Sequence, residues 1–188
     1  MPVAHLNFRR HFVLLACAFA VIVILAQLNP FGSSSLLPSA AIYGALHAIA
    51  LSGALDFGAT LARKSLFILL AAALDVAALY IGIFSLGLFS TLPLGLNVRV
   101  CLALGVCSMA GAICYGLLIR FFWLPELTPR PIARIALGCL MATLLALLLE
   151  NLSGLTSLWG LAAVWWCAFS SGLWVFGRTH PLGPHADA

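Results

Sequence analysis

Charged side chains are scarce in this chain, which has nine Lys and Arg and five Asp and Glu among its 188 residues. They make up 7% of the residues, whereas a soluble domain averages about 25%. Hydrophobic residues make up 64%, and the mean hydropathy is +1.15. Because a soluble fold could not cover that much apolar surface, the composition predicts an integral membrane protein in the lipid bilayer.

The sequence also lacks the motifs of common enzymes and metal sites. It has no HExxH and no CxxC, and none of the Ser-Gly pairs at Ser52, Ser153 and Ser171 has the preceding glycine of a GxSG loop. All six cysteines lie in apolar segments, where they predict small packing residues: Cys17, Cys101, Cys107, Cys114, Cys139 and Cys167. We therefore expect no enzymatic activity, no metal site and no cofactor.

Six apolar segments are long enough, or nearly so, to cross a membrane, which takes roughly 20 residues. They run over residues 12–28, 38–61, 65–89, 98–122, 132–149 and 155–176. Helices are expected, since lipid offers backbone groups no hydrogen-bond partner. The sequence contains no hydrophilic stretch that could fold as a second domain. The prediction is an all-α bundle of six transmembrane helices, forming a single membrane domain over residues 1–188.

The positive charges follow these segments in an alternating pattern. Eight of the nine cations lie in alternate gaps: Arg9, Arg10, Arg63, Lys64, Arg120, Arg130, Arg134 and Arg178. The intervening gaps hold only Arg99. Because positive loops stay in the cytoplasm, both termini are predicted to be cytoplasmic. The cations beside helix ends are expected to meet lipid phosphates, and nucleic acid is not an expected partner.

The first segment has an alternative interpretation as a cleaved signal peptide. Arg9 and Arg10 precede it, and Ser39-Ala40-Ala41 resembles a small-residue cleavage site. The apolar run is longer than a usual signal core and the site lies well past its end, so we favour a retained helix. The sequence has no other targeting segment, which favours a multi-pass protein of a bacterial inner (plasma) membrane.

Asp75 is the first candidate functional residue, because ionisable groups inside a span are costly. It lies about ten residues, or roughly 15 Å, into the third segment, near the middle of the membrane. Desolvation there disfavours the charged form of a carboxyl group. Asp75 is therefore a candidate for a proton-coupled or cation-coupled step. The alternative is a packing role, in which Asp75 hydrogen-bonds across a helix interface.

Asp56 and His47 are the other candidates for a substrate or ion pathway. The predicted second helix places them on opposite sides, since they are nine positions apart. Asp56 belongs to a stripe of small or polar residues spaced by four, which favours close helix contact: Ala40, Gly44, Ala48, Ser52, Asp56 and Thr60. Arg63 or Lys64 is an expected ion-pair partner for Asp56. His47 is expected to be a packing residue, and haem would need a second ligand that no other deep histidine supplies.

Arg99 and Glu150 lie at the outer ends of the fourth and fifth segments. The two are predicted to form an outer-rim ion pair. Arg99 could instead bind an anionic head group.

Two functions remain open at this point. The first is a non-catalytic membrane subunit or scaffold of a larger envelope or transport assembly. Its small-residue faces would bind other membrane helices, in a homo-oligomer or a partner subunit. The second is a small-solute or ion transporter that uses the mid-membrane carboxylate of Asp75.

Overall fold

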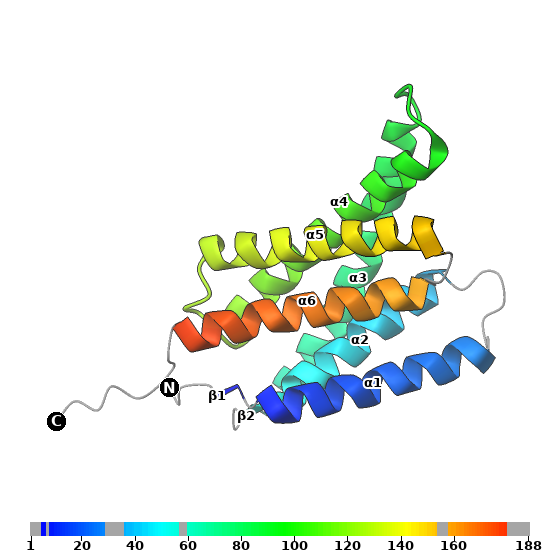
Figure 1. Ribbon diagram of the computed structural model, residues 1–188. Helices are drawn as coiled ribbons and strands as arrows, with labels where there is room; N and C mark the ends of the chain where they lie inside the picture. Colours follow the sequence, from blue (N-terminus) through cyan, green and yellow to red (C-terminus); the bar gives the residue numbers. More distant parts are fainter. Residues whose placement is uncertain (1–4, 7, 29–35, 57–59, 154–157, 180–188) are drawn as a thin grey trace.

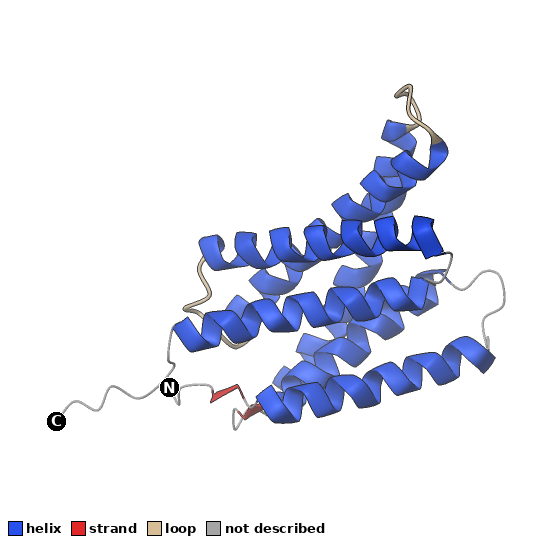
Figure 2. Ribbon diagram, viewed as in Figure 1, coloured by secondary structure: helices blue, strands red, loops and turns tan. Residues whose placement is uncertain are grey.

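The computed structural model describes residues 5–6, 8–28, 36–56, 60–153 and 158–179. These residues form six α-helices, which dominate the ribbon in Figures 1 and 2. The helices are α1 (Phe8–Leu28), α2 (Leu36–Ala54), α3 (Leu61–Phe89), α4 (Leu96–Phe122), α5 (Pro129–Ser153) and α6 (Leu158–Thr179).

The helices form a closed ring in chain order. Each helix contacts the one before it, and α1 also contacts α6. The turn between α3 and α4 extends beyond the rest of the bundle, as Figure 1 shows. Residues far apart in the sequence, at the start of α1 and the end of α6, are thereby brought together.

Four of the described helices are long and apolar enough to cross a membrane: Leu37–Ala54, Leu61–Phe89, Leu96–Phe122 and Pro129–Leu149. A shorter apolar stretch, Leu161–Gly177, lies within α6. The prediction of an all-helical membrane protein is supported to this extent.

The second helix ends earlier than the sequence predicts. α2 stops at Ala54, and Leu55–Asp56 form a short strand, β2, that pairs antiparallel with β1 (His5–Leu6). Two local features weaken the helix there. The Ser52 hydroxyl donates a hydrogen bond to the carbonyl of Ile49, and a glycine such as Gly53 costs a helix about 1 kcal/mol relative to alanine. The predicted continuation to residue 61 is therefore corrected, and Asp56 lies outside the helix.

Close helix contacts depend on glycines in three places. A Cβ added at Gly44 of α2 would lie 2.6 Å from the carbonyl oxygen of Ala71 in α3. Added at Gly116 or Gly172, it would lie 2.9 or 2.8 Å from an α5 isoleucine side chain. The predicted close contact at Gly44 is confirmed, and the helix that approaches belongs to the same chain.

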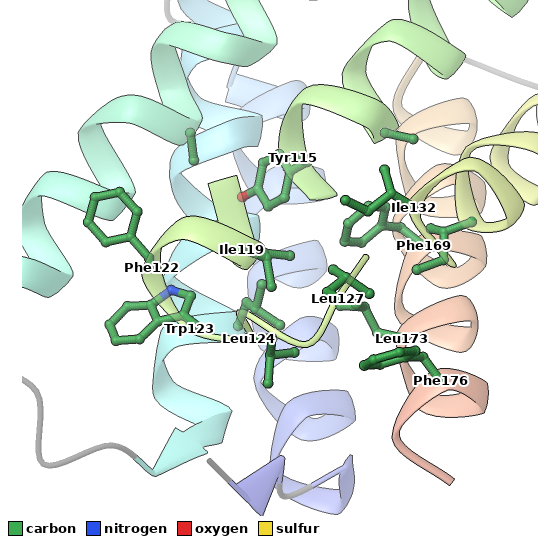
Figure 3. Close-up of a cluster of buried hydrophobic side chains, with 14 of the residues drawn as sticks. Tyr115, Ile119, Phe122, Trp123, Leu124, Leu127, Ile132, Phe169, Leu173 and Phe176 are labelled. Atoms are coloured by element: carbon green, nitrogen blue, oxygen red, sulfur yellow. The ribbon is translucent and has the colours of Figure 1, made fainter. Parts of the chain in front are cut away.

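The packed core occupies one end of the bundle. Its residues come from the second halves of α2, α4 and α6 and the first halves of α3 and α5. Because neighbouring helices run antiparallel, these halves share the end where α2 connects to α3 and α4 to α5. Figure 3 shows side chains of α4, α5, α6 and the loop after α4 converging there, among them Tyr115, Phe122, Leu127 and Phe169.

Candidate functional site

A cavity of about 260 Å³ lies between α2, α3, α4, α5 and α6. Its lining comes mainly from the first halves of α2, α4 and α6 and from the middle or second halves of α3 and α5. It therefore occupies the middle of the bundle and the half opposite the packed core. Small apolar residues form much of its wall. Its main polar and aromatic lining residues are Tyr43, Asp75, Ser108, Thr143, Trp165 and Trp166.

Asp75 contributes the carboxylate of this cavity. It is the middle residue of α3, about 21 Å along the helix axis from either end. Its side chain is half-buried. Within the described part of the chain, the carboxylate makes no hydrogen bond and no ion pair. The structure thus places Asp75 in a cavity wall, where the carboxylate can meet a ligand.

Two hydrogen bonds connect lining residues of the cavity to one another. Thr143 of α5 donates a hydrogen bond to the Ser108 hydroxyl of α4, at 2.9 Å. The Trp165 indole nitrogen of α6 donates to the Ser108 carbonyl oxygen, at 3.1 Å. These bonds connect α4, α5 and α6 at the cavity. The second bond fixes Trp165 in the cavity wall and gives its indole N–H an acceptor in an apolar environment.

His47 lies behind the two cavity tryptophans, in a cluster of aromatic rings. Its imidazole stacks on Trp166, with ring centroids 5.3 Å apart and an angle of 13°. The rings of Tyr115, Trp165 and Phe169 surround it at 4.9 to 5.7 Å. The side chain is fully buried, and neither ring nitrogen has a hydrogen-bond partner among the described residues.

The structure therefore separates the three residues expected on one pathway. Asp75 lines the cavity and His47 lies behind its aromatic wall. The backbone of Asp56 pairs with that of His5, and its side chain lies outside the described residues. The expected ion pair of Asp56 with Arg63 or Lys64 therefore stays a prediction. Arg63 donates a hydrogen bond to the Phe122 carbonyl, and its guanidinium lies 5.2 Å from the Trp123 ring centroid.

The outer-rim pair remains a prediction. The side chain of Glu150 lies outside the described residues. Arg99 is half-buried in the first turn of α4, and its buried Nε has no hydrogen-bond partner among the described residues.

Two features near the site were not expected from the sequence. Tyr43 joins the cavity from α2, and its ring meets Trp166 edge to face at 6.0 Å. His11, which follows two arginines at the start of α1, is fully buried, and its Nε2 lies 2.8 Å from the Ser170 hydroxyl. The adjacent Trp165 and Trp166, in the middle of the last apolar segment, are the sequence feature that could have indicated the aromatic wall. No signal indicated His11, because its partner is 159 residues away.

No protein-family model, no curated protein and no solved structure matches this chain. The cavity and its lining residues therefore carry the functional interpretation.

Proposed function

We propose that this protein moves a small solute across a membrane through the central cavity, with Asp75 as the residue that binds the solute. The proposal is based on the Asp75 carboxylate, which lies in a cavity at the middle of the bundle and has no hydrogen-bond or ion-pair partner among the described residues. A carboxyl group at that depth is costly unless it has a role or a partner. If it served only packing, we would expect a hydrogen bond to a neighbouring helix.

The uneven packing of the bundle supports transport. The cavity occupies one half of the bundle, and the other half is closed by the packed core around Tyr115 and Phe169. A transporter exposes its site first to one side and then to the other. An open half and a closed half are what one stage of that cycle requires, with the aromatic cluster as the barrier.

The proposed topology follows from the basic residues. All six helices cross the membrane, and both termini face the cytoplasm. Arg63, Arg120 and Arg134 belong to the ends of α3, α4 and α5 that lie beside the packed core. Positive charge is retained on the cytoplasmic side. The cavity then opens away from the cytoplasm of a bacterial inner membrane, and the aromatic barrier lies on the cytoplasmic side.

A non-catalytic subunit or scaffold has less support. That hypothesis drew on small-residue faces available to partner helices. Gly44, Gly116 and Gly172 instead approach α3 or α5 of the same chain, so these positions are already used within the bundle.

Cysteine labelling tests transport without knowledge of the solute. Cys107 is half-buried and lines the cavity. A membrane-impermeant cationic methanethiosulfonate is added to right-side-out and to inside-out vesicles, and each labelled cysteine is identified by peptide mass spectrometry. We expect Cys107 to react in both orientations, because the cavity opens to each face in turn. Cys139 is buried in the packed core, behind the barrier as seen from the open half of the cavity, and should stay unlabelled in right-side-out vesicles.

Reaction of Cys107 from one face alone would contradict transport and leave a binding pocket. Labelling of Cys139 at the same rate as Cys107 would show general loosening of the bundle. In a Cys107→Ala variant, the label on the peptide that contains residue 107 must disappear. This control shows that the signal comes from Cys107.

A further inference from the structure

We infer that the solute is a small organic cation, bound between the Asp75 carboxylate and the indoles of Trp165 and Trp166. This inference rests on the proposed function, because it names the class of solute for the same cavity. Four properties of the cavity support it: its charge, its polar groups, its aromatic rings and its size.

The charge of the cavity favours a cation. Asp75 is the one carboxylate among the described lining residues, and they include no lysine or arginine. The basic residues of α3, Arg63 and Lys64, lie in its first turn. Arg63 is engaged there by Phe122 and Trp123, at the far end of the packed core. A buried carboxylate without a partner is unfavourable, and a positively charged ligand would supply that partner. An anionic solute would instead meet repulsion from Asp75.

The polar groups do not suit a bare inorganic cation. Ions such as Ca²⁺ or Mg²⁺ need about six oxygen ligands around them. The described residues contain no group of three His, Cys, Asp or Glu side chains able to hold a metal ion. The hydroxyls of Ser108 and Thr143 are bonded to each other. One carboxylate in a mostly apolar wall is better matched to an organic cation, which needs no complete shell of oxygen atoms.

The aromatic rings supply the second half of the recognition. Tyr43, Trp165 and Trp166 line the cavity together with Asp75. The faces of aromatic rings attract cations, tryptophan most strongly, and such rings commonly bind alkylated ammonium groups. Hydrogen bonding and stacking hold both indoles in place. A ligand with a substituted ammonium group and a short apolar body would use both parts of the wall.

The size of the cavity limits the ligand. Its volume of about 260 Å³ lies just below the range of roughly 300–1,000 Å³ that is typical of ligand pockets. A compact ammonium compound is therefore expected, and a long amphiphile is not.

The test compares charged and uncharged probes of the same shape. Three probes are titrated calorimetrically into the purified full chain in nanodiscs: choline, tetraethylammonium and neopentyl carbinol. Neopentyl carbinol (3,3-dimethylbutan-1-ol) is the uncharged carbon isostere of choline. We expect saturable binding of at least one cation, and affinity for neopentyl carbinol weaker than that for choline by at least about tenfold. Potassium chloride at equal ionic strength serves as the inorganic control and should not compete.

Variants of Asp75 connect this binding to the cavity. Asp75→Asn should weaken cation binding by at least about tenfold, and Asp75→Glu, which keeps the charge, should retain it. Ser85→Ala is the matched control in α3, because Ser85 is buried outside the cavity lining and its hydroxyl donates to the Ile81 carbonyl of its own helix. Its affinity should equal that of the wild type. Each variant is compared by size-exclusion profile, so that misfolding is recognised. If Asp75→Asn is misfolded, the comparison of choline with neopentyl carbinol in the wild type decides the result.

Three results would overturn the inference: no binding of either cation, equal affinity for neopentyl carbinol and choline, or unchanged affinity in a folded Asp75→Asn. If Cys107 still reacts from both faces, the transport path stands and its solute is not a small organic cation held by Asp75. If choline binds through Asp75 while Cys107 reacts from one face only, the cation site stands and transport is rejected.

Discussion

Replacing Gly44 by alanine should separate α2 from α3 and destabilise the bundle. The added Cβ would lie 2.6 Å from the Ala71 carbonyl oxygen and 3.0 Å from the Ala72 Cα. Both contacts are with backbone, which cannot rotate away as a side chain can. The Gly44 carbonyl oxygen also accepts a hydrogen bond from the Tyr115 hydroxyl, with an oxygen–oxygen distance of 3.1 Å. A shift of α2 would therefore weaken a second contact.

The expected loss of folding free energy combines two destabilising contributions with one stabilising contribution. Overpacking of a well-packed core costs about 1–3 kcal/mol. A weakened hydrogen bond between membrane helices adds about 0.6 kcal/mol, and the better helix propensity of alanine returns about 1 kcal/mol. We therefore expect Gly44→Ala to lower the free energy of unfolding by about 2 kcal/mol.

The assay is thermal unfolding of the full chain in one detergent, followed by loss of the monodisperse size-exclusion peak. Gly138→Ala in α5 is the matched control, because nothing lies within 4 Å of a Cβ added there. That variant should be as stable as the wild type or more stable by up to about 1 kcal/mol. If Gly44→Ala melts at or above the temperature of Gly138→Ala, the close contact between α2 and α3 is wrong.

Two further predictions concern polar groups near the cavity. His47→Phe should keep or raise the melting temperature, because the buried imidazole has no hydrogen-bond partner in the described part of the chain and an aromatic ring suits its neighbours. A loss of more than about 1 kcal/mol would contradict this. Thr143→Val should cost about 0.6 kcal/mol by removing the bond to Ser108. The same change should cost nothing further in a Ser108→Ala background, and full additivity in that double-mutant cycle would show that the hydroxyls are not coupled.

The helices could be predicted from the sequence more fully than the site. Runs of apolar residues long enough to cross a membrane indicated each helix, since lipid leaves the backbone few alternatives. The end of α2 was predicted wrongly because the residues after it pair with His5–Leu6. That strand precedes α1 in the sequence, so it is distant from α2 along the chain. Local sequence contains no record of such a distant partner.

The depth of Asp75 could be read from the sequence, but its surroundings could not. A helix that is apolar on every side gives no sign of which face meets protein and which meets lipid. The cavity wall also required α2, α4 and α6 to meet, and their order around the ring is set by packing. His47 likewise gained its aromatic neighbours from α4 and α6, which no local pattern on α2 could indicate.

Chemical modification of Asp75 tests the central claim most directly, namely that its carboxylate faces a solute cavity. The wild-type chain in liposomes is treated with a small carbodiimide and an amine, and modified carboxyl groups are identified by mass spectrometry. Glu126, which is exposed between α4 and α5, is the reactive reference. We expect Asp75 to be modified, and choline to slow its modification without protecting Glu126. Modification of Glu126 alone, with Asp75 unreactive in the folded protein, would contradict it.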